Sequence, residues 1–81
     1  MNREKWSDPR VSPQRLVVKL MEETGEVAKA FGDYTERHTP VDRSHALSAV
    51  ISECDHVIFI AEQLKEASVA TLATGVGHGH G

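Results

Sequence analysis

Hydrophobic residues recur at helical spacing along two stretches of the chain. In the first stretch they are Leu16, Val17, Leu20, Val27, Ala28 and Phe31. Ser12 is a favourable N-cap and Pro13 suits the first helical position. This helix is therefore predicted to begin at residue 13 and to end between Gly32 and Thr35. In the second stretch the apolar residues form one amphipathic stripe, made of Leu47, Val50, Ile51, Cys54, Val57, Ile58, Ala61 and Leu64.

The segments around these helices carry weaker patterns. Residues 36–44 are mostly polar and contain Pro40, so they are predicted to connect the helices, with Asp42 or Ser44 as the second N-cap. Residues 1–11 are predicted to be a polar lead-in. Residues 68–81 are predicted to be a loose end, in which 68–74 either extend the helix or fray. The glycine-rich end also holds His78 and His80, which suit weak binding of a transition metal or no ordered role.

The expected fold is all-α, with an antiparallel helical hairpin in one domain spanning residues 1–81. Two helices bury only a small core, and a chain of 81 residues is stabilised only marginally on its own. We therefore expect a homodimer or homotetramer in which hairpins pair into a four-helix bundle.

Composition excludes several classes of protein. A single cysteine, Cys54, excludes an internal disulfide framework and fits a reducing compartment. The formal net charge is −3 and no Lys/Arg cluster stands out in the sequence, so a DNA or RNA polymer is not an expected partner. No apolar run approaches the length of a membrane span, and the N-terminus lacks a secretory signal pattern. A cytoplasmic protein without a membrane partner is expected.

Three glutamates lie close together on the first predicted helix. Glu23 and Glu26 are three residues apart, and Glu22 and Glu26 are four apart, so either pair shares a helix face. Like charges at this spacing repel, and a hard divalent cation such as Mg²⁺ or Mn²⁺ between them would relieve the repulsion. The alternative is a solvated outer face, on which Lys19 and Lys29 supply the compensating charge.

The second helix adds a further group of polar residues. Glu53, Asp55 and His56 stand among the apolar positions, with Cys54 and Val57 beside them. In an antiparallel hairpin this group can face the three glutamates. Carboxylates and imidazoles from two helices can then hold one or two divalent ions.

The two motifs, KLMEETGEVAKAF and ECDHVIFIA, resemble those of the MazG-like all-α nucleoside triphosphate pyrophosphohydrolases. That family carries an E-E-x-x-E pattern on one helix and E-x-x-D, followed by an apolar run, on a later one. The resemblance implies helical dimers or tetramers that use Mg²⁺ to split a nucleoside triphosphate into the monophosphate and pyrophosphate. It also implies that Glu23 and Glu26 are metal ligands. Glu22 would be a further ligand or the base, and either Glu22 or Glu23 would accept the proton of the attacking water.

The second motif departs from the family pattern, and two registers are possible. If Glu53 is the motif's glutamate, His56 replaces the aspartate; if Asp55 is the aspartate, Ser52 replaces the glutamate. The first register is favoured because it places Val57 toward the core. The imidazole of His56 would then shift the metal preference from Mg²⁺ toward Mn²⁺. The predicted metal ligands are Glu23, Glu26, Glu53 and His56.

Substrate contacts are predicted less sharply. The basic side chains that could hold the leaving pyrophosphate are Lys19, Lys29 and Lys65. The aromatic side chains that could stack on the base are Trp6, Phe31 and Tyr34, although Trp6 also suits a hydrophobic anchor for the N-terminal arm. The C-terminal end lacks the basic residues that grip phosphates in many relatives. The sequence therefore leaves open an alternative function, a helical oligomer that has lost catalysis and acts as a nucleotide-binding or interaction module.

Overall fold

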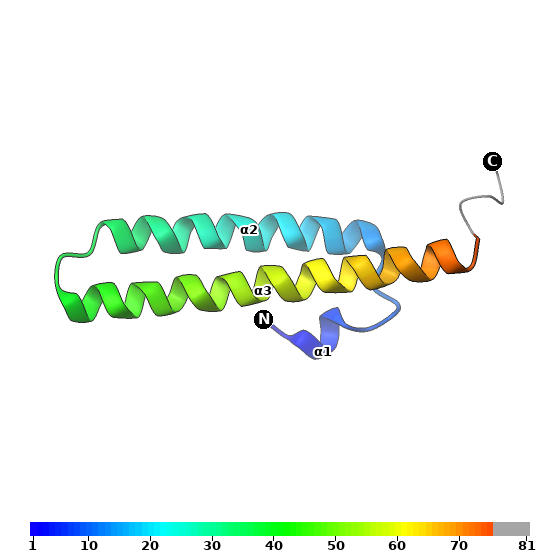
Figure 1. The fold of residues 1–81 in the computed structure, drawn as a ribbon, viewed down its shortest axis with the longest axis horizontal. Coiled ribbons are helices and arrows are strands. Elements are labelled where there is room, and N and C mark those ends of the chain that lie inside the picture. The colour runs from blue at the N-terminus through cyan, green and yellow to red at the C-terminus, as the bar shows by residue number, and fades with distance from the viewer. Residues whose placement is uncertain (76–81) are drawn as a thin grey trace.

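The computed structural model describes residues 1–75, and within this range every regular element is a helix. The elements are α1 (Arg3–Trp6), α2 (Pro13–Thr35) and α3 (Pro40–Ala73). Figure 1 shows α2 and α3 side by side and antiparallel, joined by a short loop. The predicted all-α helical hairpin is thereby confirmed. No helix within residues 1–75 is both long enough and apolar enough to cross a membrane.

Both long helices begin with a hydroxyl N-cap followed by proline. The Ser12 side chain accepts a hydrogen bond from the Arg15 backbone N–H at 3.2 Å, as the sequence predicted. The prediction that Asp42 or Ser44 caps the second helix is wrong. Thr39 is the N-cap, and its side chain accepts a hydrogen bond from the Asp42 N–H at 3.2 Å. The reason is that a threonine followed by Pro40 gives the same start signal as Ser12 followed by proline.

The C-terminal part of α3 is more regular than expected. The helix continues through residues 68–73, which were predicted to belong to a loose end. Ser68 and Thr71 donate their hydroxyls to carbonyls one turn back, and no glycine or proline interrupts this segment. Gly75, with φ of 71°, follows the helix at a position where glycine is favoured. His78 and His80 lie outside the described residues.

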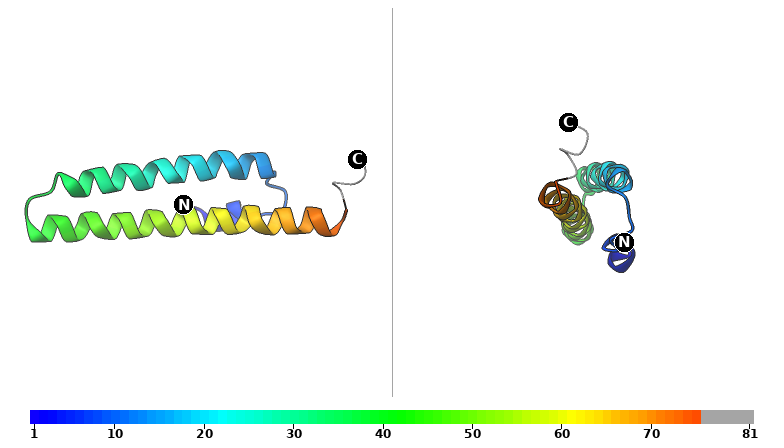
Figure 2. Two further views of the ribbon diagram at one scale, coloured as in Figure 1. Left: turned by 45° about the horizontal axis from the view of Figure 1, so that its top comes forward. Right: turned by 90° about the vertical axis from the view of Figure 1, so that its right-hand side faces the viewer.

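The N-terminal arm is also partly ordered into a helix. The single turn of α1 is capped by the Asn2 side chain, which accepts from the Lys5 N–H at 3.1 Å. The arm packs against α3, where the Arg3 guanidinium lies 4.7 Å from the centroid of the Phe59 ring. Figure 2 shows α1 as a separate segment beside the two long helices. The arm thus returns along the hairpin and reaches its middle.

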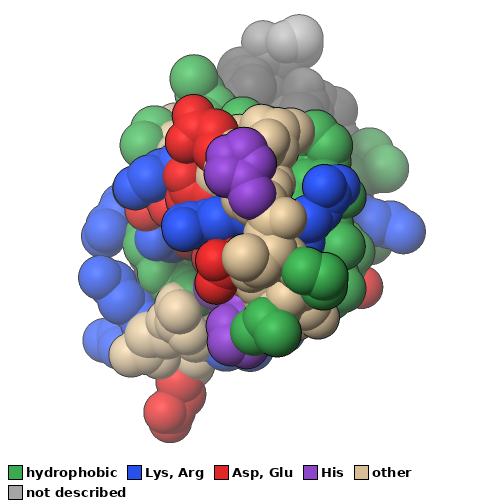
Figure 3. Space-filling model, turned by 90° about the vertical axis from the view of Figure 1, so that its left-hand side faces the viewer, with side chains coloured by type: hydrophobic (Ala, Val, Ile, Leu, Met, Phe, Trp, Pro, Cys, Tyr) green, Lys and Arg blue, Asp and Glu red, His purple; other side chains and the backbone are tan. Residues whose placement is uncertain are grey.

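The hairpin encloses a very small core. Among the described residues the only buried hydrophobic side chains are Leu16, Ala30 and Ile60. Ile51 and Ile58 belong to the predicted stripe of α3, yet they remain 63% and 56% exposed. The reason is that α2 alone covers only part of the apolar stripe of α3. Figure 3, which views the loop end of the hairpin, shows hydrophobic side chains at the surface on both flanks of a polar strip.

Candidate metal centre

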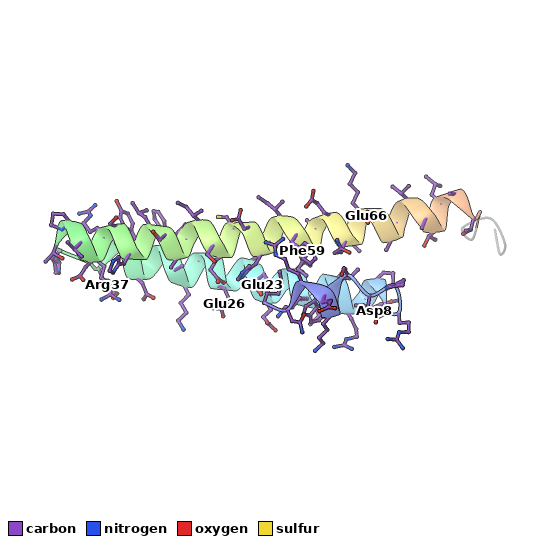
Figure 4. The ribbon with its side chains drawn as sticks, turned by 90° about the horizontal axis from the view of Figure 1, so that it is seen from below. Asp8, Glu23, Glu26, Arg37, Phe59 and Glu66 are labelled. Atoms are coloured by element: carbon purple, nitrogen blue, oxygen red, sulfur yellow. The ribbon has the colours of Figure 1, made fainter. Side chains whose placement is uncertain are left out.

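A glutamate occupies a core position on α2. The buried residues of this helix are Leu16, Glu23 and Ala30, which are spaced by seven and therefore lie on one face. This face packs against α3, so Glu23 is only 5% exposed. Figure 4 shows Glu23 in the middle part of the hairpin. A carboxylate at such a position is costly unless a cation or several hydrogen bonds compensate it.

Two residues of α3 approach the Glu23 carboxylate. Glu53 and His56 are three residues apart, so they project from the same face of the helix. The His56 Nδ1 atom lies 3.5 Å from Glu23 Oε2 and 3.4 Å from Glu53 Oε1. The three side chains place donor atoms within 4.8 Å of one another. They form a compact group of two carboxylates and one imidazole, which we call the EEH cluster.

The two distances from His56 to the carboxylates of the EEH cluster suit a shared cation. Two donors that each lie about 2.1 Å from one ion, at tetrahedral or octahedral angles, are roughly 3.0–3.5 Å apart. The separations of 3.4 and 3.5 Å around His56 fall at the upper end of this interval. Glu23 Oε2 is also buried without any hydrogen-bond partner. The donor set and this unpartnered oxygen therefore fit a divalent metal ion.

A simple ion pair accounts less well for the same atoms. A protonated His56 donating to a carboxylate would lie about 2.7–2.9 Å from the acceptor oxygen. The observed distances are 0.5 Å or more longer, and Glu23 Oε2 remains without a hydrogen bond. A direct hydrogen bond from His56 therefore does not compensate the buried oxygen.

The other oxygen of Glu23 faces a lysine. Lys19 Nζ lies 3.5 Å from Glu23 Oε1 and 2.8 Å from Glu22 Oε1. The hydrogen bond to Glu22 raises the pKa of Lys19, and the charges of Glu22 and Glu23 act in the same direction, whereas desolvation opposes them. Lys19 therefore stays cationic beside the EEH cluster. Lys29 is exposed on α2 and forms no ion pair within residues 1–75.

The remaining acidic residues of the two motifs lie outside the cluster. Glu26 is exposed on α2 and does not join the group of close donors; Figure 4 places it next to Glu23, further toward the loop. Asp55 is exposed as well, so the Glu53/His56 register is the one that faces α2. Glu22 has a side chain 59% exposed and is held by Lys19. Three of the four predicted ligands thus come together, and Glu26 does not.

A group of cations surrounds the half-buried Trp6 near the EEH cluster. The ammonium groups of Lys5 and Lys19 lie 5.3 and 5.1 Å from its ring centroid, and the guanidinium of Arg15 lies at 5.4 Å. Sequence reasoning named Trp6 and Lys19 but missed Lys5 and Arg15. Helical spacing pairs Arg15 with Lys19, four residues later on α2, but their meeting with Lys5 and Trp6 depends on how the arm folds back. We call Lys5, Arg15 and Lys19, with Trp6, the arm cluster.

The other two aromatic candidates lie elsewhere on the hairpin. Phe31 and Tyr34 contact each other at the loop end, with ring centroids 5.5 Å apart. The Tyr34 hydroxyl accepts a hydrogen bond from Arg43 at 2.9 Å, and the same guanidinium stacks over its ring. These rings are two to three turns from Glu23 along α2, so Trp6 is the one of the three predicted stacking residues that lies near the EEH cluster.

Comparison with known proteins adds no relative from which roles can be transferred. No family model, curated protein or solved structure matches this chain. The assignment of the EEH cluster therefore rests on its own geometry and on the two motifs from which it is built.

Proposed function

We propose that the chain is a metal-dependent pyrophosphohydrolase that converts a nucleoside triphosphate, or its deoxy form, into the monophosphate and pyrophosphate. The observation that carries the proposal is the buried Glu23 oxygen, which lacks a partner and faces Glu53 and His56. A helical hairpin with acidic side chains facing each other is also the arrangement that the MazG-like resemblance implies.

The residues that would hold the metal are Glu23, Glu53 and His56. A divalent ion at this position supplies charge stabilisation for phosphate oxygens. Two carboxylates suit Mg²⁺, and the imidazole donor favours Mn²⁺ over it. Glu26 is exposed one turn away, so it would contribute only if its side chain turned toward the cluster.

The chain's own residues divide the remaining tasks. In this proposal Glu22, the accessible carboxylate that pairs with Lys19, accepts the proton of the attacking water. The water oxygen bonds to the α-phosphorus, the bond to the β-phosphate oxygen breaks, and pyrophosphate leaves. Lys19, already paired with Glu22 and Glu23, offers positive charge at the same place.

A second copy of the chain completes the fold in this proposal. The described residues of one hairpin expose large apolar side chains on both long helices, among them Met21, Ile51, Ile58 and Val69. The accessible surface of 5914 Å² exceeds the ~4,800 Å² expected of a globular monomer of this mass. Pairing of two hairpins into a four-helix bundle would bury these faces.

The direct test is release of pyrophosphate from a panel of nucleoside and deoxynucleoside triphosphates, with Mg²⁺ and with Mn²⁺. We expect turnover of one or a few substrates, faster with Mn²⁺, and its loss in Glu23→Gln. Glu62→Gln is the matched control, since Glu62 is an exposed glutamate of α3 outside the EEH cluster. No release with either metal from a folded oligomer would refute catalysis.

That negative result would favour the second candidate function, a non-catalytic nucleotide-binding or interaction module. The observation that favours this second candidate is His56, which stands where the MazG-like family that the chain resembles has an aspartate. Residues 68–75 also contain no basic side chain.

A further inference from the structure

We propose that the arm cluster is a binding subsite for a polyphosphate chain, in which Lys5, Arg15 and Lys19 hold the anion beside Trp6. The inference deepens the proposed function and rests on it in one respect: the natural ligand is taken to be the triphosphate tail of the substrate. The N-terminal arm would then supply the phosphate-binding charge that the C-terminal segment lacks.

The geometry of the arm cluster suits a ligand with several negative groups. Each of the three cationic groups lies within 5.4 Å of one point, the Trp6 ring centroid, so no two are further apart than twice that distance. A hollow of ≈ 370 Å³ opens at this place, and its lining includes Trp6, Arg15, Lys19 and Glu22. A triphosphate chain can contact more than one of these cations at once.

Within the described part of the chain, Glu22 and Glu23 compensate the charge of Lys19, but no carboxylate compensates the other two cations of the arm cluster. Lys5 and Arg15 form no ion pair with a carboxylate within residues 1–75, and neither does Arg3 in the same arm. Arg15 also lies in the first turn of α2, where the helix dipole disfavours a cation. Its guanidinium is exposed and lies over the Trp6 ring, and a bound polyanion would add the anionic partner that no carboxylate within residues 1–75 supplies.

Lys19 connects the arm cluster to the EEH cluster. Its ammonium group lies 5.1 Å from the Trp6 centroid and 3.5 Å from Glu23 Oε1. A phosphate group held by Lys19 would therefore lie beside the proposed metal ligands. The remaining phosphates would extend toward Arg15 and Lys5, away from the loop end of the hairpin.

The experiment uses the chain's only tryptophan as its reporter. Inorganic tripolyphosphate is titrated into the protein at constant ionic strength, with a chelator present, while Trp6 fluorescence is followed. We expect a saturable change. The dissociation constant should rise about tenfold in Arg15→Gln, equivalent to ~1.4 kcal/mol, with a similar rise in Lys5→Gln. Arg37→Gln should bind like the parent, because Arg37 lies beyond the far end of α2 and carries the same charge.

Several results would overturn the subsite. They are the absence of a saturable change, an equal loss of affinity in Arg37→Gln, and an equal response to sodium sulfate at the same ionic strength. Circular dichroism of each variant checks that the helices are intact, and dissociation constants rather than amplitudes are compared, since Arg15 is close to the reporter.

Glu23→Gln separates this inference from the proposed function. The variant should bind tripolyphosphate at least as tightly as the parent even though turnover is lost. Tripolyphosphate binding by a protein that hydrolyses no triphosphate would refute the proposed reaction and leave the subsite standing. Turnover by a protein that does not bind tripolyphosphate would refute the subsite alone.

Discussion

Replacing Glu23 by glutamine should have opposite effects on stability without and with metal. In the metal-free protein Glu23 Oε2 is buried and lacks a hydrogen-bond partner. Leaving such a group unsatisfied costs about 1–3 kcal/mol, and more when it is charged. The neutral amide relieves part of this cost, although it also weakens the contact of Lys19 with Glu23 Oε1. We expect metal-free Glu23→Gln to be more stable than the parent by about 1 kcal/mol.

Bound metal should make the parent more stable than Glu23→Gln, which reverses the order expected without metal. At ten times its dissociation constant, Mn²⁺ stabilises a protein with one site by about 1.4 kcal/mol. An entropy of unfolding near 2.1 cal/mol/K per residue gives about 170 cal/mol/K for this chain. The parent should therefore gain about 8 °C in melting temperature. Glu23→Gln should gain little, because it has lost the carboxylate at the centre of the EEH cluster.

The assay is thermal unfolding followed by circular dichroism, at one fixed protein concentration because association also shifts the transition. Glu62→Gln removes the same charge from an exposed position. Its melting temperatures without and with Mn²⁺ should each differ from those of the parent by no more than 2–3 °C, which is about 0.5 kcal/mol. An equal metal response in the parent and in Glu23→Gln would refute the metal site. A metal-free Glu23→Gln that melts below the parent would refute the argument about the unpartnered oxygen.

Four further outcomes are expected. His56→Asp should shift the metal preference of pyrophosphate release from Mn²⁺ toward Mg²⁺, and an unchanged ratio would show that His56 is not a ligand. Glu26→Gln should lower pyrophosphate release much less than Glu23→Gln, since Glu26 is exposed. An equal loss of pyrophosphate release would show that Glu26 belongs to the site. Ile58→Glu should convert the proposed oligomer to monomers in sedimentation, because Ile58 is 56% exposed on the single hairpin, and an oligomer that persists would show that the interface lies elsewhere. A hydrogen bond from Arg10 lowers the pKa of Asp8 from 3.8 to about 2. The contact should therefore stabilise the fold above pH 4, and this stabilisation should be lost as the pH falls toward 2. In Arg10→Gln the pKa of Asp8, measured by NMR titration, should return toward 3.8.

The sequence predicts the helices, and which residues of α3 face α2, because these depend on local signals. Apolar spacing and the Ser12 cap give the bounds of α2, and hydrophobic phase selects Glu53 and His56 over Asp55 as the residues that face the other helix. Charge alone could not separate Glu23 from Glu26, since both fit a helix face. Their difference depends on which sector of α2 contacts α3.

The features that the sequence did not predict depend on tertiary contacts or on a choice between several residues that are equally good helix caps. The start of α3 was placed too late because Asp42 and Ser44 are also good caps, and only the structure shows that Thr39 takes this role. Lys5 and Arg15 are ten residues apart and belong to different elements. Their meeting around Trp6 follows from the path of the arm, which no periodicity encodes.

The position of Lys19 has a thermodynamic consequence. One ammonium group neutralises Glu23 in the EEH cluster and also contributes to the arm cluster. An anion that draws Lys19 toward itself leaves the Glu23 carboxylate more negative, so a cation binds there more tightly. Linkage makes the effect reciprocal, because the factor by which the anion strengthens cation binding equals the factor by which the cation strengthens anion binding. A metal ion and a polyphosphate should therefore bind cooperatively, even if they never touch each other.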